Sequence, residues 1–141
     1  MKVIIAIVVL FFTGLQANSQ CENKVTWYAS KADMVDASGS VLQTKEGVII
    51  LETGPQKVSL SFRESTEAGL EGIVKEKICD WKEPFKNGKT VYRTTVSIDG
   101  RTSNASFTLE ATEGKILLSV EIESMAGKKF LVYINRYEES K

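Results

Sequence analysis

The stretch TVYRTTVSIDGRTSNASFTLEATEGKILLSVEI, residues 90–122, decides the fold class. Apolar and polar side chains alternate along it with a period of two, which is typical of β-strands that bury one face. The alternation stops at Asp99-Gly100, which suits a two-residue hairpin turn because both positions tolerate a positive φ, and again at Glu113-Gly114, where the chain is predicted to turn once more. Three strands joined by such short turns are expected to pair antiparallel as a meander. Their apolar faces comprise Tyr92, Thr94, Val96 and Ile98, then Ala105, Phe107, Leu109 and Ala111, then Ile116, Leu118, Val120 and Ile122.

The same alternation extends to both sides of this stretch. Towards the C-terminus, a turn near 124–127 leads to a further apolar face formed by Phe130, Val132 and Ile134. On the N-terminal side, the polar segment 31–39 is predicted to be a loop with one short turn. Strands are predicted at 25–29, 41–44, 47–53, 57–62 and 70–81, with 41–44 and 47–53 paired across Lys45-Glu46 and a bulge at Gly72.

These elements predict an all-β fold of eight or nine strands within one domain, residues 20–141. We expect an antiparallel up-and-down meander that closes, or nearly closes, into a barrel, because closure removes exposed strand edges. A sandwich of two packed sheets is the alternative architecture. Short turns and sequential order suit a barrel of lipocalin-like shape. This is a likeness of architecture alone, since the chain lacks the Gly-X-Trp start typical of lipocalins.

The first nineteen residues are predicted to be a secretory signal peptide rather than part of this domain. Lys2 precedes an apolar run over 3–12, and Ala17 and Ser19 are the small residues expected before a cleavage site after Ser19. The run is too short to span a bilayer as a helix, and no other stretch could do so. We therefore expect a secreted or periplasmic protein. Lipid anchoring at Cys21 is a less favoured alternative, because the residue before it is the large Gln20.

Composition narrows the function classes. The sequence carries 18 basic and 18 acidic residues, so it lacks the positive charge that nucleic-acid binding requires. It contains no histidine, which removes the usual general base and the common nucleophile pairs of enzymes. Most zinc sites are also excluded, because with no histidine they would need four cysteines and the chain has two. The sequence predicts no enzyme, metal site or cofactor.

The stretch ICDWKEPFKNGK, residues 78–89, raises the question of a reactive cysteine. Cys79 lies beside Asp80, whose negative charge raises the pKa of a thiol and so opposes a nucleophilic role. In an oxidising compartment the two cysteines of the chain are expected to pair, which predicts a Cys21–Cys79 disulfide. Pro84 is expected to end the strand, and Asn87-Gly88 to turn the chain into the next one.

Aromatic side chains are the better candidates for ligand recognition, because small-molecule sites are mainly apolar. The same side chains could instead simply fill the core of a small β-domain. Tyr133 and Tyr137 fall on the face opposite Phe130 and Val132, so they are expected to be exposed or to form a second contact surface. The candidate ligand-binding residues are Trp27, Phe62, Trp81, Phe85, Tyr92 and Phe107.

Two functions remain open at this point. The first is an exported, non-enzymatic module that binds a protein or surface partner; Val, Ile, Leu and Phe at the inward positions favour it, because they fill small barrels. The alternative is a carrier of a small apolar ligand. A cavity of about 300 Å³ or more that opens at one end would favour the carrier. Its lining would be drawn from Trp27, Leu60, Phe62, Tyr92, Val96, Phe107, Leu118 and Val132.

Overall fold

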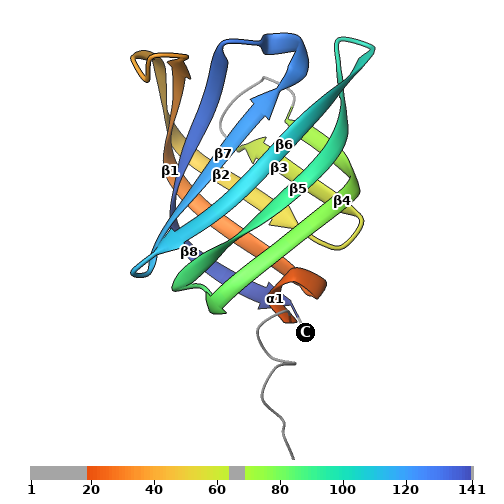
Figure 1. Ribbon diagram of the computed structural model, residues 1–141. Helices are drawn as coiled ribbons and strands as arrows, with labels where there is room; N and C mark the ends of the chain where they lie inside the picture. Colours follow the sequence, from red (N-terminus) through yellow and green to blue (C-terminus); the bar gives the residue numbers. More distant parts are fainter. Residues whose placement is uncertain (1–18, 64–68, 141) are drawn as a thin grey trace, which may run out of the picture.

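The computed structural model describes residues 19–63 and 69–140, so the predicted signal peptide lies outside the described residues except for Ser19. Every strand pairs antiparallel with its neighbours in sequence, and the last strand pairs with the first, which closes the barrel (Figure 1). The closed up-and-down meander is thus confirmed and the two-sheet alternative is wrong. The elements are α1 (Ser19–Glu22), β1 (Lys24–Asp36), β2 (Val41–Thr53), β3 (Lys57–Phe62), β4 (Leu70–Glu83), β5 (Asn87–Ile98), β6 (Arg101–Thr112), β7 (Lys115–Ile122), the 3-10 turn η1 (Glu123–Met125) and β8 (Lys128–Ser140).

The hairpin turns of the C-terminal half form where the sequence predicts them. Ile98 pairs with Arg101, and Asp99 and Gly100 between them have φ values of 51° and 78°. The β6–β7 turn at Glu113-Gly114 has the same form, with φ values of 52° and 82°. Both pairs occupy the left-handed region that two-residue hairpin turns require.

The N-terminal half corrects two predictions. The segment 41–53 is one strand and not a hairpin, since Lys45 pairs with Ala32 and Glu46 with Lys31 on β1. For the same reason, most of the segment predicted as a loop over 31–39 belongs to β1. Neither Lys45 nor Glu46 is a residue type that favours the left-handed conformation, so nothing forces a turn there.

The strand β4 and the turn after it correct two further details. The bulge expected at Gly72 is absent, and the register of β4 shifts instead between Val74 and Glu76 and again near its end. The chain reverses before Asn87, where β5 already begins, with Phe85 in the turn at a φ of 63°. Pro84 follows the last residue of β4, as predicted.

A bulge in β8 reverses the inward and outward faces near the C-terminus. Ala29 pairs with Ile134 and Tyr28 with Arg136, so one residue of β8 is left over between them. A one-residue bulge moves every later side chain to the other face. Tyr137 therefore pairs with the inward-facing Trp27 and does not share the outer face of Tyr133, although both tyrosines are exposed as predicted.

The middle of the barrel is filled by apolar side chains. Inward residues from every strand meet in one core cluster, to which β4 contributes Trp81, and the residues of this cluster are almost fully inaccessible to solvent. This agrees with the expectation that Val, Ile, Leu and Phe fill a small barrel. The largest of these side chains are Tyr92, Phe107, Ile49, Leu51, Leu109, Leu118 and Val132.

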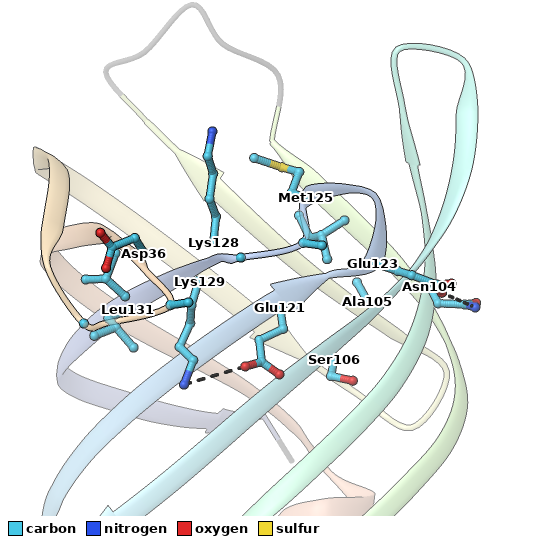
Figure 2. A pocket seen from close by; sticks show the side chains of 16 residues that line it. Asp36, Asn104, Ala105, Ser106, Glu121, Glu123, Met125, Lys128, Lys129 and Leu131 are labelled. Carbon is cyan, nitrogen blue, oxygen red and sulfur yellow. Dashed lines mark hydrogen bonds and ion pairs between the residues drawn. The ribbon is translucent and has the colours of Figure 1, made fainter.

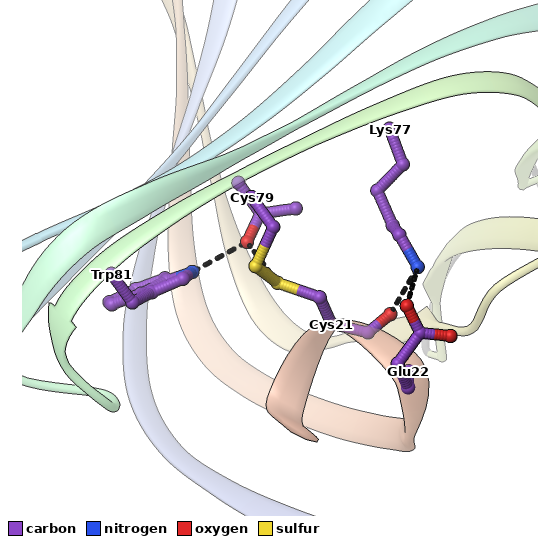
Figure 3. The surroundings of a disulfide bond; sticks show 6 residues. Cys21, Glu22, Lys77, Cys79 and Trp81 are labelled. Carbon is purple, nitrogen blue, oxygen red and sulfur yellow. Dashed lines mark hydrogen bonds and ion pairs between the residues drawn. A yellow bond between two sulfur atoms is a disulfide. The ribbon is translucent and has the colours of Figure 1, made fainter. Parts of the chain in front are cut away.

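One end of the barrel, which we call the α1 end, is closed by α1. Cys21 in α1 forms a disulfide with Cys79 in β4, with 6.3 Å between their Cα atoms, as the sequence predicts (Figure 3). Lys77 donates hydrogen bonds to the backbone oxygen of Cys21 at 2.9 Å and to the carboxylate of Glu22 at 3.0 Å. The C-terminal end of β8 lies here too, since Ser140 pairs with Lys24.

The disulfide also corrects the alternative of lipid anchoring at Cys21. A thioether to a lipid needs the same sulfur atom that Cys21 shares with Cys79, and one sulfur cannot make both bonds. The described part of the chain has no free cysteine. A disulfide of this kind is typical of an oxidising, extracellular environment.

Candidate functional site: the mouth of the barrel

The opposite end of the barrel, which we call the mouth, contains a cavity of about 400 Å³. Its lining residues include Met34 and Gln43, near the β1–β2 turn, and Asp99 in the β5–β6 turn. Both turns lie at the end of the barrel away from α1 (Figure 1). The floor of the cavity is formed by Leu60, Val120 and Val132, which are nearly inaccessible to solvent and belong to the filled middle. Its walls are mainly apolar and include Met34, Phe62, Leu70, Ile98, Ile122 and Phe130.

A lysine stands among these apolar walls. Lys45 lines the cavity, because it pairs with the inward-facing Ala32 and lies an even number of residues before the buried Ile49 and Leu51. Its ammonium nitrogen is 5.1 Å from the centre of the Phe62 ring, within the range of a cation–π interaction. Lysine is among the residues least often found on an inward face, and Lys45 is only half-buried here.

Two acidic residues, Asp33 and Asp99, also line the cavity. The carboxylate of Asp33 accepts hydrogen bonds from the hydroxyls of Thr44 at 2.7 Å and Tyr133 at 2.8 Å. Thr44 pairs directly with Asp33 on the outer face of the barrel, so the carboxylate is held outside. Asp99 lies in the exposed β5–β6 turn. Lys45 is the one cationic side chain that lines the cavity among the residues the structure describes.

The hydrogen bonds at Asp33 also shift the pKa values of the Asp33 carboxyl and of the Tyr133 hydroxyl that donates to it. The Thr44 hydroxyl, followed by that of Tyr133, lowers the pKa of the Asp33 carboxyl, because both stabilise its charged form. The bond to Asp33 in turn raises the pKa of Tyr133. With both carboxylate oxygens engaged and only 5% of the residue exposed, Asp33 joins β1, β2 and β8 on the outer face.

A second and wider hollow, of about 780 Å³, lies on the outside of the barrel beside η1 (Figure 2). Its charged groups bind one another. Glu121 forms an ion pair with Lys129 at 3.6 Å, and the amide of Asn104 donates to Glu123 at 2.8 Å. The carboxylate of Asp36 accepts three hydrogen bonds within its own turn, from Ser38 and the backbone of Ser40. This groove is therefore a weaker candidate than the mouth cavity, which is less open to solvent.

Of the six aromatic residues proposed from the sequence as ligand contacts, Phe62 alone lines the mouth cavity. Tyr92 and Phe107 fill the middle of the barrel. The two tryptophans lie towards the α1 end, where each indole nitrogen donates to a buried threonine. Trp27 donates to Thr53 at 2.9 Å and Trp81 to Thr90 at 2.6 Å.

Phe85 belongs to an aromatic cluster that covers the α1 end. Its ring stacks on Tyr137 with centroids 4.0 Å apart, and both rings contact Trp27. Tyr137 is 41% exposed and Phe85 is half-buried, so the cluster lies at the surface. Offset and tilted ring pairs of this kind stabilise packing, which accounts for these three residues.

Lys45 and most of the wall residues were not recognised from the sequence. The sequence did contain evidence that Lys45 faces inward. Every second residue of β2 points into the barrel, so Lys45 and Gly47 continue the inward positions of Ile49 and Leu51. This alternation was not recognised because Lys45-Glu46 was interpreted as a turn, and a turn would end the strand between Lys45 and Ile49. Phe62 was identified because its own strand alternates without interruption.

No metal centre is indicated within residues 19–63 and 69–140, because no group of three or more Cys, Asp or Glu side chains is suitably placed. In the same part of the chain, no helix is both long enough and apolar enough to cross a membrane. Comparisons with protein-family models, with curated proteins and with solved structures found no match.

Proposed function

We propose that this protein is exported and carries a small apolar molecule in the mouth cavity. The observation that carries this proposal is a mainly apolar cavity of about 400 Å³ that opens at one end of an otherwise filled barrel. Small-molecule sites are typically concave, apolar and of 300–1,000 Å³ with a few polar groups. Eight-stranded barrels have room for one small ligand when part of the interior is left unfilled. The cavity therefore favours the carrier over the partner-binding module.

Export is supported by two independent features. The N-terminal sequence has the basic start, apolar run and small residues of a signal peptide. The Cys21–Cys79 disulfide requires an oxidising compartment to persist. A ligand carrier outside the cytoplasm would act by holding an apolar molecule that water dissolves poorly.

Binding of a protein or surface partner remains the second candidate function. Two consecutive apolar residues at the start of β2, Val41 and Leu42, are 57% and 50% exposed. Both lie near the mouth, in the strand that carries Lys45. The other exposed apolar side chains are scattered singly over β2, β4 and β8, which is ordinary for a protein surface.

The carrier proposal is tested by titrating the purified, oxidised protein with N-phenylnaphthylamine, a neutral apolar dye that fluoresces when it leaves water. We expect saturable binding at one site. Replacing Ala32 by Phe fills the cavity from β1 and should weaken binding at least about tenfold, or about 1.4 kcal/mol. The matched control, Ala37→Phe, adds the same ring in the outer groove and should leave the affinity within about twofold.

Two results would contradict the carrier. One is the absence of saturable dye binding by wild-type protein whose circular dichroism shows a folded β-protein. The other is an equal loss of affinity in Ala37→Phe and Ala32→Phe, which would place the dye in the outer groove. The second candidate function, binding of a partner, is supported instead if the dye does not bind, if the wild-type protein captures a single partner protein, and if the Leu42→Ser variant does not capture it.

A further inference from the structure

We propose that the mouth cavity takes an amphipathic molecule tail first, and that the floor residues Leu60, Val120 and Val132 limit the length of its tail. This inference rests on the proposed carrier function and adds the class of ligand and the residues that select it. Two features of the cavity carry it. One end of the cavity is closed and apolar, and the other end is lined by exposed polar side chains.

The floor is closed because its three side chains form the layer of the filled middle that lies nearest the mouth. They are at most 4% exposed. Each pairs across the barrel wall with an inward side chain that is at most 1% exposed and does not line the cavity, namely Leu51, Phe107 and Leu118. Interiors packed in this way contain few voids, so a ligand tail has no space to extend beyond the floor.

The opposite end of the cavity, its rim, is polar. Gln43, Ser97 and Asp99 line it and are exposed to solvent, whereas the aromatic walls Phe62 and Phe130 are half-buried. A molecule with one polar end can keep that end hydrated at the rim while its tail leaves water. The reverse orientation would bury the polar end against the aliphatic floor, where it finds no side chain to form a hydrogen bond. The ligand should therefore enter tail first.

A closed floor gives the affinity a dependence on tail length that an open channel would not give. Each CH₂ group that moves from water into an apolar site strengthens binding about fourfold. This gain should continue until the tail reaches the floor. Further CH₂ groups must then stay in water or force packed side chains apart. The affinity should therefore stop rising at one tail length.

The first test measures how well straight-chain alcohols of even length, from hexanol to tetradecanol, displace N-phenylnaphthylamine from the oxidised protein. For the wild type we expect the affinity to rise about fifteenfold for each two carbons, and by about twofold or less once the tail reaches the floor. This levelling should occur before the series ends. A rise that continues undiminished to tetradecanol, or no displacement by any alcohol, would overturn the proposal.

The floor itself is tested with Leu60→Ala, which deepens the cavity. The first alcohol beyond the wild-type limit should bind this variant at least about fivefold more tightly than it binds the wild type, while octanol stays within about twofold. Leu109→Ala is the matched control, because Leu109 is also buried but belongs to the filled middle and does not line the cavity. It should leave the length limit unchanged. An equal shift in both variants, or in neither, would show that the floor does not set the limit.

The second test compares decanol with the ten-carbon diol that has a hydroxyl at each end. Tail-first entry places the second hydroxyl of the diol against the aliphatic floor, so the diol should bind at least about tenfold more weakly than decanol. Equal binding of the two molecules would mean that both ends reach water, which contradicts a closed floor and tail-first entry.

The outcomes separate this inference from the carrier function. If the dye binds the wild type and Ala32→Phe weakens it, but the alcohols show no length limit, selection by the floor is wrong and the carrier stands. If the dye does not bind folded wild-type protein at all, the carrier function itself fails. Thermal unfolding shows whether each variant is folded. Val132→Ala, a smaller truncation of the same floor, gives a second reading should Leu60→Ala be unstable.

Discussion

Gly88 lies where the start of β5 passes directly against Trp81 on β4. A Cβ atom at position 88 would lie 2.5 Å from the Cα atom of Trp81 and 2.6 Å from the backbone oxygen of Asp80. The φ of Gly88 is +146°, a region that other residue types rarely adopt. Backbone atoms on a paired strand cannot move aside as a flexible side chain can, so the close approach of β4 and β5 depends on this glycine.

We predict that Gly88→Ala destabilises the protein by about 3 kcal/mol or more, since it combines a backbone clash with an unfavourable φ. Gly100→Ala is the control, because Gly100 has a φ of +78° and no atom within 4 Å of an added Cβ. It should lose only the conformational term, about 1 kcal/mol. Urea unfolding measures both values, and equal losses would contradict the role assigned to the contact with Trp81.

The direction of a single side chain was predictable wherever strand alternation is uninterrupted. Phe62, Tyr92 and Phe107 face inward as the period of two requires. Tyr137 was not predictable in this way, because the bulge in β8 has no distinctive residue such as glycine to mark it. Lys45 was missed for a related reason, since a polar pair between two apolar runs resembles a turn.

At the scale of the element, the strand boundaries in the C-terminal half could be predicted from the turn residues. The Asp99-Gly100 and Glu113-Gly114 pairs mark the hairpin turns between β5, β6 and β7, so the ends of these strands at the turns could be predicted closely from the sequence. The long strands β1 and β2 could not, because their ends are held by pairing with each other and with β8. The helix α1 has four residues and no periodicity to reveal it; the disulfide and Lys77 hold it in place.

Removing the disulfide with Cys21→Ser and Cys79→Ser is predicted to lower the free energy of unfolding by about 4 kcal/mol at most. The bond joins residues 58 positions apart, and the loss of that constraint on the unfolded chain sets the estimate. A loss close to that limit would lower the midpoint of thermal unfolding by about 10–20 °C. Differential scanning calorimetry with and without reductant gives the measurement.

The same experiment contains its own control. Reductant should lower the midpoint of the wild-type protein to that of the double variant, and should leave the double variant unchanged. The protein is unfolded in reductant so that the disulfide is fully reduced, and is then refolded and measured in the same reductant. If the wild-type midpoint is unchanged after this treatment, the bond between α1 and β4 contributes nothing to stability.

At the scale of the whole molecule, the barrel consists of a filled middle and a hollow mouth. The sequence could predict closure, because alternating strands with short turns must bury one face and pair their edges. It could not predict the cavity. The alternation of apolar and polar residues indicates which side chains face the interior, but not whether those side chains fill the interior completely. The volume left at the mouth depends on bulges in β1 and β8 that set where each inward side chain lies.

This division predicts unequal effects of the same truncation at two inward positions. Phe107→Ala removes a fully buried ring from the filled middle and should cost about 3–5 kcal/mol. Phe130→Ala removes a half-buried ring from the cavity wall and should cost about 1 kcal/mol, since the space it leaves already opens to solvent. Chemical denaturation measures both variants. Equal losses would mean that the mouth is packed as tightly as the middle.

The placement of the two chain ends bears on how this protein can be handled. α1 and the final residues of β8 both leave the barrel at the closed end, and the cavity opens at the other. A bead, sensor chip or fused domain coupled through either end of the described chain would therefore face the disulfide and leave the cavity turned towards the solution. The barrel can be immobilised in one orientation without engineering a new attachment point.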